Sequence, residues 1–333
     1  MEKVFFRKPA LIQHMKQAPK QNNDSLAETY VLVEITNENI AKIHEMCERN
    51  RDYYPVPLGY FIRGTLGDSG YIPELCVAIF EKSDEKHERP IGYFHLTKRK
   101  GWVMGTRVYV KSFMIDTPYR RKGIGTWALR EMMKRAKKRF PRSTIHFGAC
   151  NPDYWFPGVD TRHTAALFFL YKMGFKKHGI IQSLTVHLEQ FKDWNPITER
   201  NGYTFRRATP EDLPALKAFV KKNFFGTWHL EAEHSFKNNP PTTFIALDPN
   251  KSIVGFSSHS VEFPSAFGPI GINKAIRGQR LGDILLRWCM WDIMNMGHST
   301  AIIMWVVGDV PKFYSKTIGA YIHPIYYSVK RWL

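Results

Sequence analysis

Residues 113–129 read FMIDTPYRRKGIGTWAL, and this stretch decides the interpretation of the rest of the chain. A strand pattern runs from Arg107 to Ile115, and a helix pattern runs from Thr126 to about Arg139. Between them, residues 120–125 form a basic turn with two glycines. The first amides of a helix lack intrahelical partners and carry partial positive charge. The stretch therefore predicts a site for an anion such as a pyrophosphate.

A second stretch of the same kind lies at residues 269–286, which read PIGINKAIRGQRLGDILL. It again joins a strand pattern to a basic turn with glycines and a helix pattern, which Gly297 ends. Arg280 stands where the first stretch has its central glycine, Gly123. Neither stretch contains a GxxxxGK[ST] loop or a GxGxxG fingerprint, so two common nucleotide-binding motifs are excluded.

The elements around the two stretches follow the same order. The first half is expected to contain strands at 30–35, 76–82, 91–96, 107–115 and 144–150, and helices at 36–50, 126–139 and 164–173. The second half is expected to contain strands at 203–208, 242–247, 252–262, 267–273, 300–306 and 321–330, and helices at 209–224, 281–297 and 312–318. The sequence thus predicts a duplicated α+β unit. Its expected parts are a basic N-terminal extension at 1–28, a first domain at 29–195, a linker at 196–202 and a second domain at 203–333.

The composition excludes several classes of protein. The 333 residues are 44% hydrophobic and 23% charged, which is typical of globular domains. The four cysteines show no metal-ligand spacing, so no metal site is expected, and a reduced cytoplasmic setting is predicted. No apolar run approaches the roughly 20 residues of a membrane span. The net charge of +18 favours anionic ligands.

The two stretches resemble the pyrophosphate loops of the GNAT superfamily, the N-acetyltransferases that use acetyl-CoA. The loop of that family reads [RQ]-x-x-G-x-[GA]; residues 120–125, RRKGIG, match it completely, and residues 277–282, RGQRLG, depart from it at Arg280. The resemblance covers nearly the whole chain after about residue 28, and the tandem arrangement is similar to that of bacterial mycothiol synthase. It implies two GNAT-fold domains, each a mixed, mostly antiparallel sheet that splays at the acetyl-CoA cleft and has flanking helices.

The resemblance also implies where acetyl-CoA binds. The pantetheine arm pairs with the strand before each loop, which here is Phe113, Met114 and Ile115, and then Ile270, Gly271 and Ile272. The pyrophosphate meets the loop and the start of the helix. In the first half these residues are Arg120, Arg121, Lys122, Gly123, Ile124, Gly125 and Thr126, and in the second half Arg277, Gly278, Gln279, Arg280, Leu281, Gly282 and Asp283. Because Arg280 replaces a glycine, we expect tighter binding in the first half.

Two residues are candidates for catalysis. In the family, a tyrosine of an FYxxxGF-like segment often protonates the departing thiolate, and Tyr314 stands nearly at that position, whereas the first half has Leu170 there. Glu262 is the acid just before the second cleft strand and is the candidate base. The structural alternatives are a packed aromatic for Tyr314 and a solvated strand end for Glu262. Asp160 is a weaker candidate for lining an acceptor pocket.

The sequence therefore predicts an acetyl-CoA-dependent N-acetyltransferase that acts on a small-molecule amine by direct transfer. One of the two domains is expected to bind CoA without turnover or to shape the acceptor site. The alternatives are a protein or aminoacyl-tRNA acceptor, or a non-catalytic module that binds CoA or nucleic acid. Nucleic acid is not the expected partner, since the basic residues are spread along the chain and no RNA- or DNA-binding signature is present. The aromatic-rich segments 50–74 and 224–242 are expected to shape the acceptor pocket. The sequence gives no indication of the oligomeric state.

Overall fold

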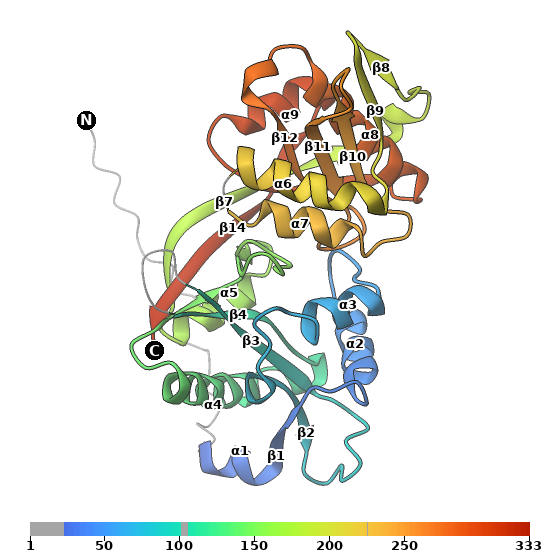
Figure 1. Ribbon diagram of the computed structural model, residues 1–333. Coiled ribbons are helices and arrows are strands. Elements are labelled where there is room, and N and C mark those ends of the chain that lie inside the picture. Colours follow the sequence, from blue (N-terminus) through green and yellow to red (C-terminus); the bar gives the residue numbers. More distant parts are fainter. Residues whose placement is uncertain (1–22, 101–105, 225) are drawn as a thin grey trace, which may run out of the picture.

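The computed structural model describes residues 23–100, 106–224 and 226–333. Two halves follow one another along the chain, and the long strands β7 and β14 run side by side between them (Figure 1). The first half contains α1 (Asn23–Thr29), β1 (Tyr30–Glu34), α2 (Ile40–Arg49), α3 (Leu58–Thr65), β2 (Cys76–Glu81), β3 (Gly92–Lys100), β4 (Thr106–Ile115), α4 (Ile124–Arg139), β5 (Thr144–Phe147), β6 (Val159–Asp160), α5 (Thr164–Lys172) and β7 (Lys176–His187).

The second half repeats the order with small differences. It contains β8 (Glu199–Arg200), β9 (Tyr203–Arg207), α6 (Leu213–Asn223), α7 (Trp228–Ser235), β10 (Thr243–Leu247), β11 (Ile253–His259), β12 (Ala266–Ile272), α8 (Leu281–Asn295), β13 (Thr300–Val306), α9 (Val310–Ile318) and β14 (Tyr321–Trp332). The predicted α+β class and its duplication are confirmed. The sequence did not indicate α1, α3, α7, β6, β7 or β8. α1 covers the end of the expected extension at 1–28 and the first residue of the expected first domain, Thr29.

The strands form one continuous sheet that opens at the same place in each half. All strand pairs among the described residues are antiparallel except β4–β5 and β12–β13. β4 pairs with β5 only from Arg107 to Val110, and β12 pairs with β13 only at Ala266 and Phe267. Beyond these residues the parallel strands diverge, which is the splayed geometry expected of the cleft. A register shift marks both β4 and β12 near this point, as β-bulges often do beside functional sites.

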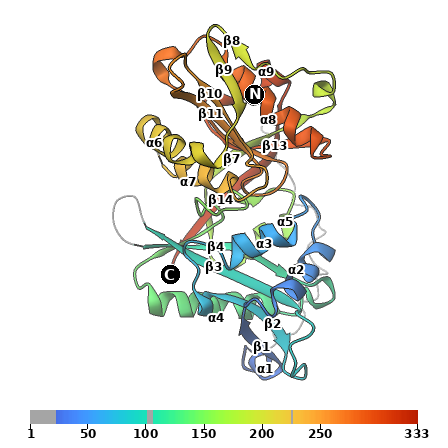
Figure 2. The ribbon, with the colours of Figure 1, turned by 45° about the vertical axis from the view of Figure 1, so that its right-hand side comes forward.

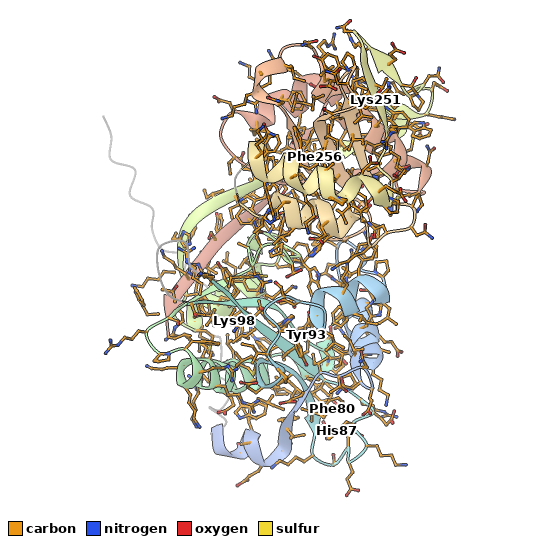
Figure 3. All side chains as sticks on the ribbon, viewed as in Figure 1. Phe80, His87, Tyr93, Lys98, Lys251 and Phe256 are labelled. Carbon is orange, nitrogen blue, oxygen red and sulfur yellow. The ribbon has the colours of Figure 1, made fainter. Side chains whose placement is uncertain are left out.

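Helices cover both faces of the sheet in each half (Figures 1 and 2). The alternation along β2 shows why: Val77 and Ile79 enter the core beneath α4, while Ala78 and Phe80 enter the core beneath α2 and α3. In the second half, Leu285 of α8 and Val220 of α6 belong to separate cores. Figure 3 shows the side chains that fill these layers. The burial of apolar side chains on both strand faces accounts for the apolar runs in the sequence.

The two halves exchange strands. The end of β14 pairs with β5 of the first half, with Lys330 opposite His146 and Trp332 opposite Thr144. The end of β7 pairs with β13 of the second half, with His187 opposite Thr300. Val329 of β14 is accordingly buried in the first-half core. Each half of the sheet is therefore completed by a strand from the other half, so the halves fold around one another and do not meet only at a linker.

Candidate functional site

The N-terminus of α4 offers unpaired backbone amides to solvent. Gly123 is the N-cap with a φ of 84°, no side chain caps the helix and no acidic residue stands in its first turn. Arg121 also has a positive φ, of 67°, and residues 120–123 are exposed. Glycine is suited to the cap position because a side chain there would be strained. The turn combines free amides, the positive end of a helix dipole and three basic side chains, which is what a pyrophosphate requires.

The turn lies against the cleft strand. A side chain at Gly125 would contact Ile115 of β4 at 3.4 Å and Phe169 of α5 at 3.8 Å. The Arg120 guanidinium donates to the carbonyl oxygen of Ile115 at 2.8 Å, which ties the loop to the end of β4. Phe113, Met114 and Ile115 are half-buried, as expected for a strand edge that faces an open splay. The structure thus brings the predicted loop and the predicted cleft strand together.

The second loop has the same backbone but a different charge arrangement. Gly278 and Arg280 have positive φ values of 91° and 62°, at the positions that correspond to Arg121 and Gly123. Arg280 donates to the carboxylate of Asp283 at 3.0 Å, and Arg287 donates to the same carboxylate at 2.8 Å. Asp283 stands in the first turn of α8, where the first half has Thr126. A carboxylate at this position competes with an incoming phosphate for the amides and the arginines.

The second cleft strand is covered by an aromatic ring at its middle residue. Ile270 and Ile272 are half-buried, but Gly271 lies directly against the ring of Phe224, where a side chain would not fit. Phe313 of α9 lies 4.0 Å from the position that a side chain on Gly282 would take, as Phe169 does beside Gly125. The two short helices therefore correspond, and Leu170 of α5 occupies the place of Tyr314 of α9, in agreement with the sequence interpretation.

Tyr314 is buried in the core beneath α8. Its ring packs edge-on against Phe267 of β12, with 6.0 Å between the centroids. Burial raises the pKa of the Tyr314 hydroxyl well above its usual value, so the group stays protonated and keeps a proton to donate. This packing is compatible with both a proton donor and a structural aromatic.

Glu262 lies in a small cavity between the two halves and not at a solvated strand end. The cavity measures about 20 Å³, which is room for about one water molecule. It is lined from the first half by Tyr60, Arg63, Gly64, Pro152, Asp153, Tyr154 and Trp155, and from the second half by His234, Val261 and Glu262. Segments 50–74 and 224–242 thus both reach this cavity, through α3 and α7.

The pKa values of Glu262 and of the nearby Glu231 are both raised. Burial raises the pKa of Glu262, and the nearby charge of Glu231 on α7 raises it further. Burial also raises the pKa of Glu231. The Tyr154 hydroxyl forms a hydrogen bond with Glu262. Carboxyl groups in such an environment take up and release protons closer to neutral pH than exposed ones do, which suits a general base.

The sequence did not indicate Glu231, Arg63 or Tyr154, because no local motif marks them. Arg63 donates to the carbonyl oxygen of Val261 at 2.8 Å, and the Tyr60 hydroxyl donates to that of Ser260 at 3.0 Å. These bonds join α3 of the first half to the segment that carries Glu262. Only the packing of two distant segments creates the site, so its one sequence signal was the aromatic content of those segments.

Asp160 and two other residues near the first-half strands, Asp116 and Cys150, have structural roles. Asp160 forms a close ion pair with Arg162 at 2.6 Å, and Asp116 accepts from Arg49 at 2.7 Å. Burial raises the pKa of the Cys150 thiol to about 11, so this cysteine is not an activated nucleophile. Within residues 23–100, 106–224 and 226–333, no cluster of His, Cys, Asp or Glu could hold a metal ion. No helix in these ranges is both long and apolar enough to cross a membrane.

Residues 43–175 match the family model described as Acetyltransferase (GNAT) family. No curated protein sequence matches the chain. A tandem GNAT protein from the clavulanic acid biosynthesis pathway has a similar fold, with a TM-score of 0.65 and 14% identity over 91% of this chain and 98% of that one. A GCN5-related N-acetyltransferase from Sphaerobacter thermophilus gives 0.60 and 15% over 91% and 95%.

A third similar structure is a GCN5-related glucosamine N-acetyltransferase region of a fungal multi-domain β-N-acetylglucosaminidase, with a TM-score of 0.66 and 16% identity over 91% of this chain. This chain spans only 38% of that fungal protein, but nearly all of the other two. At these identities the likeness concerns the fold. It supports the tandem arrangement of two GNAT-fold halves across the whole chain.

Proposed function

Residues 43–175 of this chain are a domain of the GNAT acetyltransferase family, and on that premise we propose that the protein acetylates the amine of a small molecule. The cofactor of the family is acetyl-CoA, which supplies a thioester carbonyl that an amine can attack. The observation that carries the proposal is the uncapped N-terminus of α4 at the mouth of the β4–β5 splay.

The first half is the tighter cofactor site in this proposal. Its amides from Arg121 to Thr126 would hold the pyrophosphate, and the free edge of Phe113 to Ile115 would pair with the pantetheine amides. The equivalent residues of the second half, 270–272 and 277–283, would form a weaker site because the Arg280–Asp283 ion pair occupies the helix N-terminus. The difference between the sites rests on charge, since the backbone of the two loops is alike.

The proposed catalytic groups are Glu262 and Tyr314, which lie on opposite sides of β12. Tyr314 packs against Phe267 in the core beneath α8, whereas Phe263 and Ala266, next to Glu262, belong to the core shared with the first half. Glu262 would take the proton that the amine loses as its nitrogen bonds to the acetyl carbon. Tyr314 would donate its proton to the sulfur of an acetyl-CoA bound at the second loop as the carbon–sulfur bond breaks, so turnover would belong to the second half although the first half binds the cofactor more tightly. General acid–base groups of this kind typically contribute roughly 10²–10⁴ in rate.

A thiol-release assay with acetyl-CoA and a panel of small primary amines tests the proposal. We expect release that depends on both the amine and the enzyme, with the acetylated amine as the product by mass spectrometry. Peptides with free N-termini serve as the comparison set. Release with peptides but with none of the small amines would overturn the proposed acceptor class. Absence of release with either set, in protein that binds acetyl-CoA, would overturn the enzymatic role.

A further inference from the structure

A basic face is assembled on the first-half sheet from four strands. In one row across the sheet, Tyr109 of β4 lies opposite His146 of β5, and His146 lies opposite Lys330 of β14. Lys330 in turn lies opposite Lys176 of β7. In the next row, Thr144 of β5 is opposite both Arg107 and Trp332. Directly paired residues point to the same face, so these side chains share one surface. We call Arg107, His146, Lys176, His178, Lys330 and Trp332 the basic sheet face.

This surface is the face opposite α4. Ile145 and Val329 enter the core beneath α4, so their neighbours His146 and Lys330 point to the other side. Lys176, His178 and Lys330 are exposed, and Trp332 is 72% exposed. The tryptophan therefore presents a large aromatic surface to solvent beside the cations.

No acidic side chain balances these charges within the four strands. The sequences of β4, β5, β7 and β14 contain neither Asp nor Glu. Among the described residues, no ion pair involves Arg107, Lys176 or Lys330. Burial, together with the charges of Arg107, His178 and Lys330, lowers the pKa of His146 to about 4. His146 is therefore neutral near pH 7, and the positive charge of the face comes from Arg107, Lys176 and Lys330.

We propose that the basic sheet face binds single-stranded nucleic acid. Neighbouring strands lie about 4.8 Å apart, so the three cations from Arg107 on β4 through Lys330 on β14 to Lys176 on β7 span about 14 Å across the sheet and can meet successive phosphates. Trp332 supplies a surface on which a base can stack, the feature that favours a single strand over a duplex. The proposal goes beyond acetyl transfer, since it involves neither cofactor loop.

The salt dependence of binding tests the proposal. Fluorescence anisotropy of a labelled 12-nucleotide RNA of mixed sequence would be followed against the full chain, without acetyl-CoA, between 50 and 200 mM NaCl. With three phosphates neutralised by Arg107, Lys176 and Lys330, the slope of log K against log[salt] should be about −2, because each phosphate on a single strand contributes about −0.7. The double variant Lys176→Gln/Lys330→Gln should make that slope shallower by about 1.4.

The matched control is Lys137→Gln/Lys138→Gln, which removes the same charge from exposed residues at the end of α4. It should leave the slope unchanged, whereas Trp332→Ala should weaken RNA binding without changing the slope. Equal effects of the two lysine pairs would overturn the proposed site. Equal affinity for a duplex would overturn the single-strand assignment. Binding to anionic phosphatidylserine vesicles that depends on the face, without binding to RNA, would overturn nucleic acid as the partner.

Discussion

The two glycine-containing loops have the same backbone conformation but different charged side chains at the start of the helix that follows. Both place positive φ values at the second and fourth positions, Arg121 and Gly123 in one and Gly278 and Arg280 in the other. The first leaves the helix amides open, and the second holds an Arg280–Asp283 ion pair over them. The duplicated fold thus keeps the backbone conformation of the loop while the charged side chains around it differ. We therefore expect charge, and not backbone shape, to decide which half binds acetyl-CoA more tightly.

Gly123→Glu is expected to have the largest effect and tests whether the first loop is the tighter acetyl-CoA site. The substitution places a strained, negatively charged side chain at the pyrophosphate position, so acetyl-CoA affinity should fall on the order of 10³-fold, or about 4 kcal/mol. Isothermal titration calorimetry measures the loss. Gly123→Asn, which tolerates positive φ and carries no charge, is the control and should lose much less. Unchanged affinity in Gly123→Glu would place the tight site elsewhere.

Tyr314→Phe tests whether turnover belongs to the second half. The variant keeps the ring that packs on Phe267 and removes the donor, so kcat should fall on the order of 10²–10³ while acetyl-CoA affinity stays constant. Tyr171→Phe in the corresponding helix of the first half is the matched control and should keep full turnover. Full activity of Tyr314→Phe would make this residue a packed aromatic only.

Glu262→Gln should lower kcat by about 10², because it removes the proton acceptor and keeps the shape of the side chain. The pKa of Glu262 is raised by burial and by Glu231, and the base works only when deprotonated. In the unmodified protein, kcat should therefore rise with pH through a range well above 4.5 and level off once Glu262 is ionised. Steady-state rates across pH measure this. A rise that persists unchanged in Glu262→Gln would assign it to another group.

The smallest expected effect comes from making the second loop resemble the first. The double variant Arg280→Gly/Asp283→Thr removes the ion pair and the carboxylate from the start of α8, so a second acetyl-CoA should bind about tenfold more tightly. Calorimetry would show it as a change in the weaker of two sites. If the unmodified protein shows two equal sites, the ion pair does not weaken the second one.

Much of the fold could be predicted because its signals are local. The helix that begins at Ile124 and the turn before it follow from glycines, basic residues and apolar spacing within 20 residues. β7 could not be predicted, since Lys176 to His187 begins with charged residues and a glycine and lacks a regular alternation. α3 and α7 are short and hold their position through contacts across the two halves, such as Arg63 with Val261.

By itself, the sequence indicated the duplicated unit, the two basic glycine-containing loops and the resemblance to the GNAT family, because each depends on residues that are neighbours along the chain. Only the tertiary structure decided what the loops and strands meet. It buried Glu262 beside Glu231 in a cavity between the halves, and it set Lys330 beside His146 through the exchange of β14. Along the chain the basic residues are spread out, which gives no sign of a nucleic-acid partner, whereas the strand order gathers some of them on one face. The physical reason is that pKa shifts and charge density depend on distance in space, which strand exchange sets independently of distance along the chain.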